Sequence, residues 1–186
     1  FKFSKKNKIK LFSTPFDETA VDFLEKLNCP MYKIASFEMT DLPLVKKISE
    51  TKKPIIISTG MANLEEIEET FDIAIKYNSK KNITLLYCVS NYPSNIDDFN
   101  LNNISILKKK FGCRVGLSDH SNDNRIAGAA VSAGAEVFEK HIGLENQKKG
   151  LDIKFSLKGK QIKQYKEIID FNYSLLRNAI LKGDIS

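Results

Sequence analysis

The strongest constraint on the fold is a repeated alternation between short apolar segments and longer amphipathic segments. The apolar segments are nearly continuous, which is typical of parallel strands buried on both faces. We expect strands at residues 9–14, 31–35, 54–58, 83–88, 114–118 and 136–140. The amphipathic segments predict helices near residues 17–27, 41–51, 63–77, 101–111, 125–133 and 158–181. Because strands alternate with helices, we predict an α/β protein with a parallel sheet.

Three positions set helix boundaries most clearly. Asn63 followed by Glu66 predicts an N-cap with a capping box, which is the firmest helix start in the chain. Gly112 and Gly134 come directly after predicted helices, where glycine takes the left-handed conformation at little cost.

Two architectures fit this pattern, an open doubly wound sheet and a closed (β/α)₈ barrel. The number of strands alone favours the open sheet. However, polar side chains follow every predicted strand, and in a barrel all these strand ends meet at one rim. We therefore predict a (β/α)₈ TIM-type barrel. The polar strand ends are Ser13-Thr14, Ser36-Phe37-Glu38, Ser58-Thr59-Gly60, Ser90-Asn91-Tyr92, Ser118-Asp119-His120 and Glu139-Lys140-His141.

The chain has two histidines, and each of them closes a predicted strand. Neighbouring strand ends would bring His120 and His141 within reach of one metal ion. A single histidine is more often a hydrogen-bonded core residue, but Asp119 and Glu139 beside this pair favour a metal site. Imidazole and oxygen ligands suit manganese, iron, cobalt or zinc, and the spacing alone does not identify the metal.

Hydroxyl groups and one lysine indicate an anion site on the same rim. Ser13, Thr14, Ser36, Ser58 and Ser118 supply hydroxyls near Lys33. Each hydroxyl alone would be read as a helix cap, but five around one ammonium group indicate a phosphate site. Lys33 stands inside an apolar strand, so an anionic ligand or Glu38 must compensate its charge. The candidate catalytic residues are Lys33, Glu38, Asp119 and Glu139.

Composition narrows the remaining classes of function. The 186 residues suffice for one domain, and the apolar share of 42% and the charged share of 28% are ordinary. The net charge of +6 comes mainly from lysines on predicted helix surfaces, so we expect no nucleic-acid partner. No apolar run reaches the roughly 18 residues of a membrane span, and we expect no membrane association. Three widely spaced cysteines favour reduced thiols in a cytoplasmic protein. The dinucleotide, P-loop and nucleophile-elbow motifs are absent from the sequence.

At these residues the chain resembles the sialic acid synthase family, over roughly positions 9 to 157. The matching segments come in the family's order. They are Phe12-Ser13-Thr14-Pro15-Phe16, Tyr32-Lys33-Ile34-Ala35-Ser36-Phe37-Glu38, Ile57-Ser58-Thr59-Gly60-Met61, Tyr92-Pro93, Gly116-Leu117-Ser118-Asp119-His120-Ser121 and Glu139-Lys140-His141.

The resemblance implies a barrel enzyme that condenses phosphoenolpyruvate with the open-chain aldehyde of an N-acetylated amino sugar and releases phosphate. It implies that His120 and His141 bind manganese or magnesium, which polarises the aldehyde. It also implies a homodimer of the full-length protein. The residues implied to hold phosphoenolpyruvate are Thr14, Lys33, Ser36, Ser58 and Ser118. The residues implied to line the sugar side are Phe16, Ser90, Tyr92 and Asp152.

The chain departs from the family pattern at several places. The glutamate and lysine of the family's first two strands have no counterpart here. We therefore expect one domain, residues 1–186, that forms strands three to eight of the barrel without the small antifreeze-like domain. Ser90 is more typical of the pseudaminic and legionaminic branches of the family than of the sialic acid synthases proper. The segment from Tyr32 to Glu38 most resembles the pseudaminic branch. The family's usual proline before Asp152 is replaced by Leu151, and residues 142–145 after His141 also differ from the family pattern. These two differences leave the identity of the sugar substrate undecided.

Two other functions remain open at this point. A Schiff-base aldolase or lyase acting on a keto acid would need a desolvated lysine, and Lys33 is the candidate. The second open function is that of a non-catalytic segment that binds a sugar phosphate. An incomplete barrel leaves strand edges and part of its core uncovered, so we expect residues 1–186 alone to be inactive and poorly stable.

Overall fold

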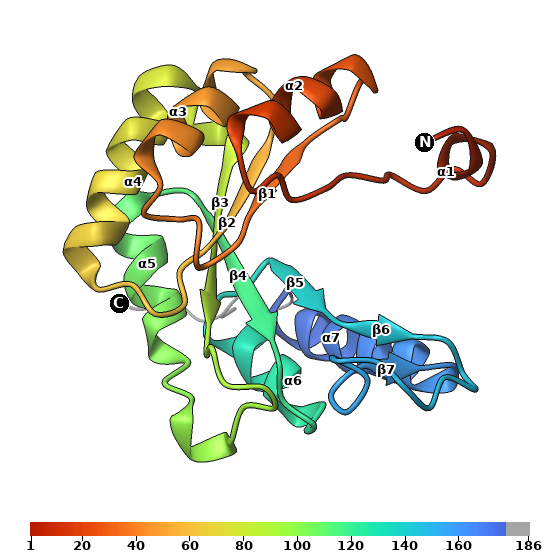
Figure 1. The fold of residues 1–186 in the computed structure, drawn as a ribbon. Coiled ribbons are helices and arrows are strands. Elements are labelled where there is room, and N and C mark those ends of the chain that lie inside the picture. Colours follow the sequence, from red (N-terminus) through yellow and green to blue (C-terminus); the bar gives the residue numbers. More distant parts are fainter. Residues whose placement is uncertain (178–186) are drawn as a thin grey trace, which may run out of the picture.

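The computed structural model describes residues 1–177, which form a curled parallel sheet with helices packed along it (Figure 1). The strand order follows the chain, β1-β2-β3-β4-β5. The α/β class and the parallel sheet predicted from the sequence are confirmed. The strands are β1 (Tyr32–Ile34), β2 (Ile55–Ser58), β3 (Ile83–Cys88), β4 (Arg114–Asp119) and β5 (Val137–Lys140).

Helices α3, α4 and α5 lie on one side of the sheet, whereas α1 lies apart from it at the end of an extended segment (Figure 1). Six helices were predicted close to their observed positions, although residues 178–181 of the last prediction lie outside the described part. The helices are α1 (Lys2–Lys6), α2 (Glu18–Lys26), α3 (Leu42–Glu50), α4 (Leu64–Tyr77), α5 (Asn102–Phe111), α6 (Arg125–Ser132) and α7 (Lys160–Arg177), with 3-10 turns η1 (Lys80–Asn82) and η2 (Ile96–Asp98). None of the helices in residues 1–177 is both long and apolar enough to span a membrane.

The strand predicted at residues 9–14 is wrong. In the structure only Ser13 pairs with the sheet, through a single parallel bridge to Tyr32. Ile9 and Leu11, which were expected to be buried, are 61% and 44% exposed. A strand of a parallel sheet is usually buried on both faces, whereas here Phe12 packs against the core and Ile9 and Leu11 stay exposed. The sheet therefore has five strands rather than the six expected.

The core lies between the sheet and its helices. Ile55, Ile57 and Leu85 of the central strands are at most 1% exposed. They pack in one cluster with apolar side chains of the helices, among them Ile48 and Ile104. Burying an aliphatic side chain of this size contributes roughly 1.5–3 kcal/mol, so the central strands are the most firmly held part of the sheet.

The predicted helix boundaries follow from local chemistry. The side chain of Asn63 accepts a hydrogen bond from the Glu66 amide, and the Glu66 carboxylate accepts one from the Asn63 amide, which completes the capping box. Gly112 ends α5 in the left-handed conformation with φ 58°, and Gly134 after α6 has φ 99°. Both glycines therefore stand where a side chain would be strained.

The connections beyond the strands shape one edge of the sheet. After β3, Ser94 forms a parallel bridge with Ser121, which ties that loop to the end of β4. After β5, two short strands that the sequence did not predict, β6 (Ile142–Gly143) and β7 (Leu157–Lys158), pair in parallel. The loop between β6 and β7 carries Asp152 and Phe155, which both contact His141 directly after β5.

Candidate active site

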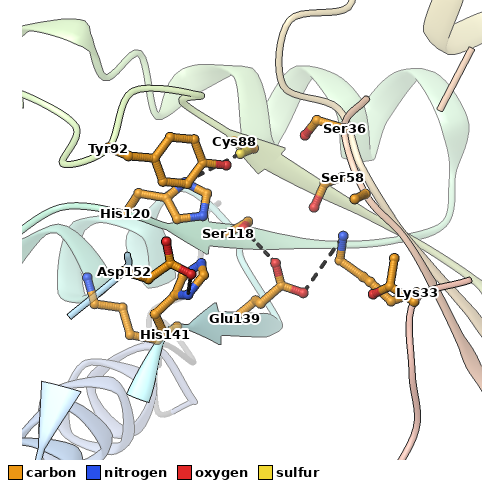
Figure 2. Close-up of a pocket in the computed structure, with 13 residues that line it drawn as sticks. Lys33, Ser36, Ser58, Cys88, Tyr92, Ser118, His120, Glu139, His141 and Asp152 are labelled. Carbon is orange, nitrogen blue, oxygen red and sulfur yellow. Dashed lines mark hydrogen bonds and ion pairs between the residues drawn. The ribbon is translucent and has the colours of Figure 1, made fainter. Parts of the chain in front are cut away.

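A cavity of about 520 Å³ lies at the carboxyl ends of the strands, where parallel α/β proteins place their ligands. Figure 2 shows its side chains converging from β1 through β5. Ten of the thirteen lining residues had been selected from the sequence. The lining residues are Thr14, Lys33, Ala35, Ser36, Ser58, Cys88, Tyr92, Ser118, His120, Glu139, Lys140, His141 and Asp152.

Lys33 supplies the positive charge on one side of the cavity. The residue is only 6% exposed, and its Nζ donates a hydrogen bond to the Ile34 carbonyl at 2.8 Å. The nearest carboxylate oxygen is Glu139 Oε2 at 3.8 Å, and Figure 2 shows this contact. Burial lowers the pKa of Lys33, and the charges of Glu139 and Glu38 oppose that shift. The ammonium group is thus incompletely paired and faces the cavity.

Hydroxyl groups surround this ammonium group. Ser58 is 3% exposed, and its Oγ has no hydrogen-bond partner among residues 1–177. Ser36 Oγ accepts a hydrogen bond from the Gly60 amide at 3.2 Å, and Ser118 Oγ donates one to Glu139 Oε1 at 2.7 Å. An unpaired buried hydroxyl costs roughly 1–3 kcal/mol, which a ligand oxygen would relieve. Four of the five hydroxyls selected from the sequence, those of Thr14, Ser36, Ser58 and Ser118, therefore line the cavity together with Lys33, and that of Ser13 does not.

The two histidines lie side by side on the other side of the cavity, with ring centroids 5.3 Å apart. His120 Nδ1 lies 3.2 Å from the Val89 carbonyl, and His141 Nδ1 lies 3.4 Å from Asp152 Oδ2. With Nδ1 engaged in both rings, Nε2 is left as the ligating atom, which is the usual arrangement of metal-binding histidines. Burial lowers the pKa of His120, which favours the neutral ring that a metal needs.

Two aromatic side chains hold these imidazole rings. The ring of Tyr92 lies 4.2 Å from that of His120, and the ring of Phe155 lies 5.1 Å from that of His141. Phe155 is 4% exposed and also contacts the ring of His120 edge-on at 6.1 Å. Packing against the rings of Tyr92 and Phe155 restricts the rotamers of the two histidines.

Five residues selected from the sequence do not line the cavity, and one of them is Ser13, which bridges to Tyr32 instead. Asp119, expected beside the histidines, is fully buried and turned toward Lys140 and Tyr165. Glu38 is half-buried behind Lys33, and one of its oxygens is buried without a hydrogen-bond partner in the described residues. Phe16 is 64% exposed, and Ser90 lies against Gly60 behind the cavity wall. Successive residues of a strand point to opposite faces, so adjacency in sequence did not bring Asp119 beside His120 in space.

Three features of the cavity were missed. Cys88 Sγ lies 3.8 Å from His120 Nδ1, and Lys140 borders the cavity beside His141. A Cβ atom on Gly60 would lie 2.3 Å from Ser90 Oγ and 2.9 Å from Ser36 Oγ, so only glycine leaves room for these hydroxyls. The places of Lys140 and Gly60 follow from the pairing of the strands and not from residue type. Cys88 ends a predicted strand, and that position was the signal that could have identified it.

The metal prediction is only partly supported by the geometry. In the part of the chain that the structure describes, no group of three or more His, Cys, Asp or Glu side chains is close enough to hold a metal ion. The donor set there is two imidazoles, with Glu139 directed instead toward Lys33 and Ser118. Two histidines that keep Nε2 available fit a metal ion with open coordination positions.

Comparison with known proteins supports the resemblance seen in the sequence. The model of the NeuB family matches residues 1–178. The chain is 45% identical to N,N'-diacetyllegionaminic acid synthase of Campylobacter jejuni, over 86% of this chain and 48% of that protein. It is 43% identical to pseudaminic acid synthase of Helicobacter pylori, over 84% and 46%. The chain thus spans about half the length of these curated relatives.

A solved structure agrees with these relatives. The N-acetylneuraminic acid synthetase of Leptospira borgpetersenii, solved in complex with citrate, superposes with a TM-score of 0.92 at 32% identity. The match covers 99% of this chain and 64% of that one. The curled sheet and its order of elements are therefore those of a known synthase structure.

Proposed function

Since this chain belongs to the NeuB family, we propose that it is part of an enzyme that joins phosphoenolpyruvate to the aldehyde of an N-acetylated amino sugar. A carbon–carbon bond forms between the enol carbon and the aldehyde carbon, water is consumed, and phosphate leaves. The relatives named above are synthases of legionaminic, pseudaminic and N-acetylneuraminic acids, which are products of this type. The product of this protein is one of the same class.

The observation that carries the proposal is the incompletely paired ammonium group of Lys33 beside the unpaired hydroxyl of Ser58. Phosphoenolpyruvate is a compact anion with a phosphate and a carboxylate. Its negative groups would form an ion pair with the ammonium group of Lys33 and accept hydrogen bonds from the hydroxyls of Ser58, Ser36 and Thr14. All four residues line the cavity. Its arrival would replace the long contact between Lys33 and Glu139 by shorter ones.

The sugar would bind on the side of the histidines. Tyr92 and Asp152 line that side, and Asp152 is also the carboxylate that orients His141. A divalent metal, manganese or magnesium, would be held by His120 and His141 and would polarise the aldehyde oxygen. Glu139 lies between the two sides, with Oε2 3.8 Å from Lys33 Nζ and Oε1 accepting a hydrogen bond from Ser118 Oγ.

We further propose that the sheet is the later part of a (β/α)₈ barrel, strands three to eight in the family's count. The five strands and the bridge at Ser13 would then represent six barrel positions. Support comes from the exposure of Ile9 and Leu11, which precede the bridge at Ser13, and from the chain's coverage of about half of the length of its relatives.

The test is an assay of the purified full-length protein with phosphoenolpyruvate and either N-acetylmannosamine or a 2,4-diacetamido-trideoxy hexose. We expect manganese-dependent phosphate release together with a nine-carbon acid detected by mass spectrometry. Lys33→Met should abolish both signals. If phosphate release requires no sugar, or if no sugar yields a condensed product, the proposal is wrong.

One observation favours a second function, a Schiff-base aldolase. Burial lowers the pKa of Lys33, as in lysines that attack carbonyl carbons. Borohydride treatment with a keto-acid substrate separates the two functions, since it traps an adduct on Lys33 only in the aldolase. The hydroxyls and the histidine pair around Lys33 favour the synthase.

A further inference from the structure

Each histidine of the cavity directly follows one member of a buried ion pair. Asp119 precedes His120 at the end of β4, and Lys140 precedes His141 at the end of β5. The strand register places Asp119 opposite Lys140. Asp119 Oδ2 and Lys140 Nζ lie 3.1 Å apart, with their side chains 0% and 5% exposed. One ion pair therefore spans the two strand ends that carry the histidines.

Helix α7 completes this buried cluster through Tyr165, which is 5% exposed. The Tyr165 hydroxyl donates a hydrogen bond to Asp119 Oδ2 at 2.9 Å, and the Lys140 ammonium lies 5.7 Å from the centre of the Tyr165 ring. The Ser121 amide donates to Asp119 Oδ1 at 2.8 Å. Lys140 also donates to the Ser121 carbonyl. The carboxylate thus accepts from three groups, and both sides of His120 are tied to the cluster.

The desolvation energy of the buried Asp119–Lys140 pair indicates that the pair contributes something other than stability. A buried ion pair is often no more stabilising than apolar side chains of the same volume, because both charges lose their hydration. Burial lowers the pKa of Lys140 and raises that of Tyr165. What such a pair does provide is a single geometry, since its charge-assisted hydrogen bonds are short and directional.

We propose that Asp119, Lys140 and Tyr165 form a positioning cluster that sets the separation and orientation of His120 and His141. The inference rests on the proposed function only in taking this histidine pair as the metal site. Asp119 and Tyr165 do not line the cavity, so they act on the metal through the backbone of the two strand ends. Lys140 borders the cavity, and its part in the cluster must be separated from any direct contact with substrate.

The first test is Tyr165→Phe in the full-length protein. This variant keeps the ring over Lys140 and removes only the hydroxyl that holds Asp119. We expect Mn²⁺, measured by electron paramagnetic resonance, to bind about tenfold more weakly, as for other groups that orient metal ligands. Affinity for phosphoenolpyruvate, measured by calorimetry, should not change. Tyr173→Phe, an exposed tyrosine on the same helix, is the matched control and should bind Mn²⁺ as the wild type does.

The second test is Lys140→Met with a crystal structure of each variant. The proposal expects the centroids of the two imidazole rings to move from their 5.3 Å separation in both variants. Unchanged rings together with wild-type Mn²⁺ affinity in Tyr165→Phe overturn it. So does a Lys140→Met variant that raises the KM for substrate while Tyr165→Phe has no effect, because Lys140 then acts directly on substrate. If the wild type binds no Mn²⁺, the proposed function fails instead, and the ring geometry alone decides the positioning role.

Discussion

Lys33→Met removes the positive charge of the proposed anion site and replaces the lysine with an unbranched apolar side chain of similar length. The side chain of Lys33 is 8% exposed, and its carboxylate partner Glu139 is 3.8 Å away and 39% exposed. After the substitution Glu139 keeps the hydrogen bond from Ser118 and its contact with water. The variant should therefore fold, and the two effects of the lost charge can be measured separately.

The effect on stability follows from the pKa of Lys33. Because burial lowers this pKa in the folded state, the ammonium form destabilises the native protein at neutral pH. The destabilisation is complete below the folded pKa and disappears as the pH rises toward the unfolded value. We therefore expect the unliganded variant to be at least as stable as the wild type at pH 7. The difference should shrink at alkaline pH.

The effect on binding is opposite and larger. A phosphate oxygen at about 4 Å from the ammonium group gains roughly 4 kcal/mol at the effective dielectric constant of partly buried sites. Loss of that energy weakens phosphoenolpyruvate binding by about 1000-fold.

Thermal melts of the full-length protein, with and without phosphoenolpyruvate, measure both effects together. The wild type should gain stability from the ligand and Lys33→Met should not. Lys46→Met is the matched control, because Lys46 is 48% exposed and 3.9 Å from Glu50 on the helix surface. A Lys33→Met protein that is much less stable than the wild type, yet still stabilised by phosphoenolpyruvate, would refute the anion-site argument.

Three further substitutions test other parts of the site. Ser58→Ala removes a buried hydroxyl that has no partner in the described residues, so the unliganded protein should keep its stability in urea titrations. Its phosphoenolpyruvate affinity, measured by calorimetry, should fall about tenfold; unchanged affinity would exclude Ser58 from the anion site. Gly116→Ala places a Cβ 2.0 Å from the Val137 carbonyl across the β4–β5 pair and should cost about 1–3 kcal/mol in chemical denaturation; a neutral result would mean that this register is not tight. His120→Ala and His141→Ala should each strongly reduce the residual rate of condensation, and the double variant should lose no more than either single one; additive losses would argue against one shared metal.

Much of the site could be predicted from the sequence because most of its groups lie in or directly after a strand. Ser58 and Ser118 stand where an apolar run stops, and Lys33 is the one charged residue inside such a run. Parallel strands bring such positions to one edge whatever the details of packing. The same logic located His120 and His141.

The failures share one cause, which is that a position in sequence does not specify a direction in space. Asp119 was expected in the cavity with His120, but alternate residues of a strand face opposite sides, and Asp119 became the buried partner of Lys140. Phe155 packs against both histidines from a loop whose return depends on the pairing of β6 with β7. The run at residues 9–14 has the composition of a strand, yet it pairs only at Ser13, and Ile9 and Leu11 remain exposed.

The sequence by itself determined the α/β class, the central strands, the helix caps and the residue types of the proposed anion site beside a histidine pair. Apolar periodicity and capping act within a few residues, so they can be read locally. Tertiary structure alone decided which charges pair. Lys33 faces Glu139 at 3.8 Å, and Asp119 faces Lys140 at 3.1 Å. These pairs join residues that are far apart along the chain, and they arise only when strand register and curvature bring the strand ends together.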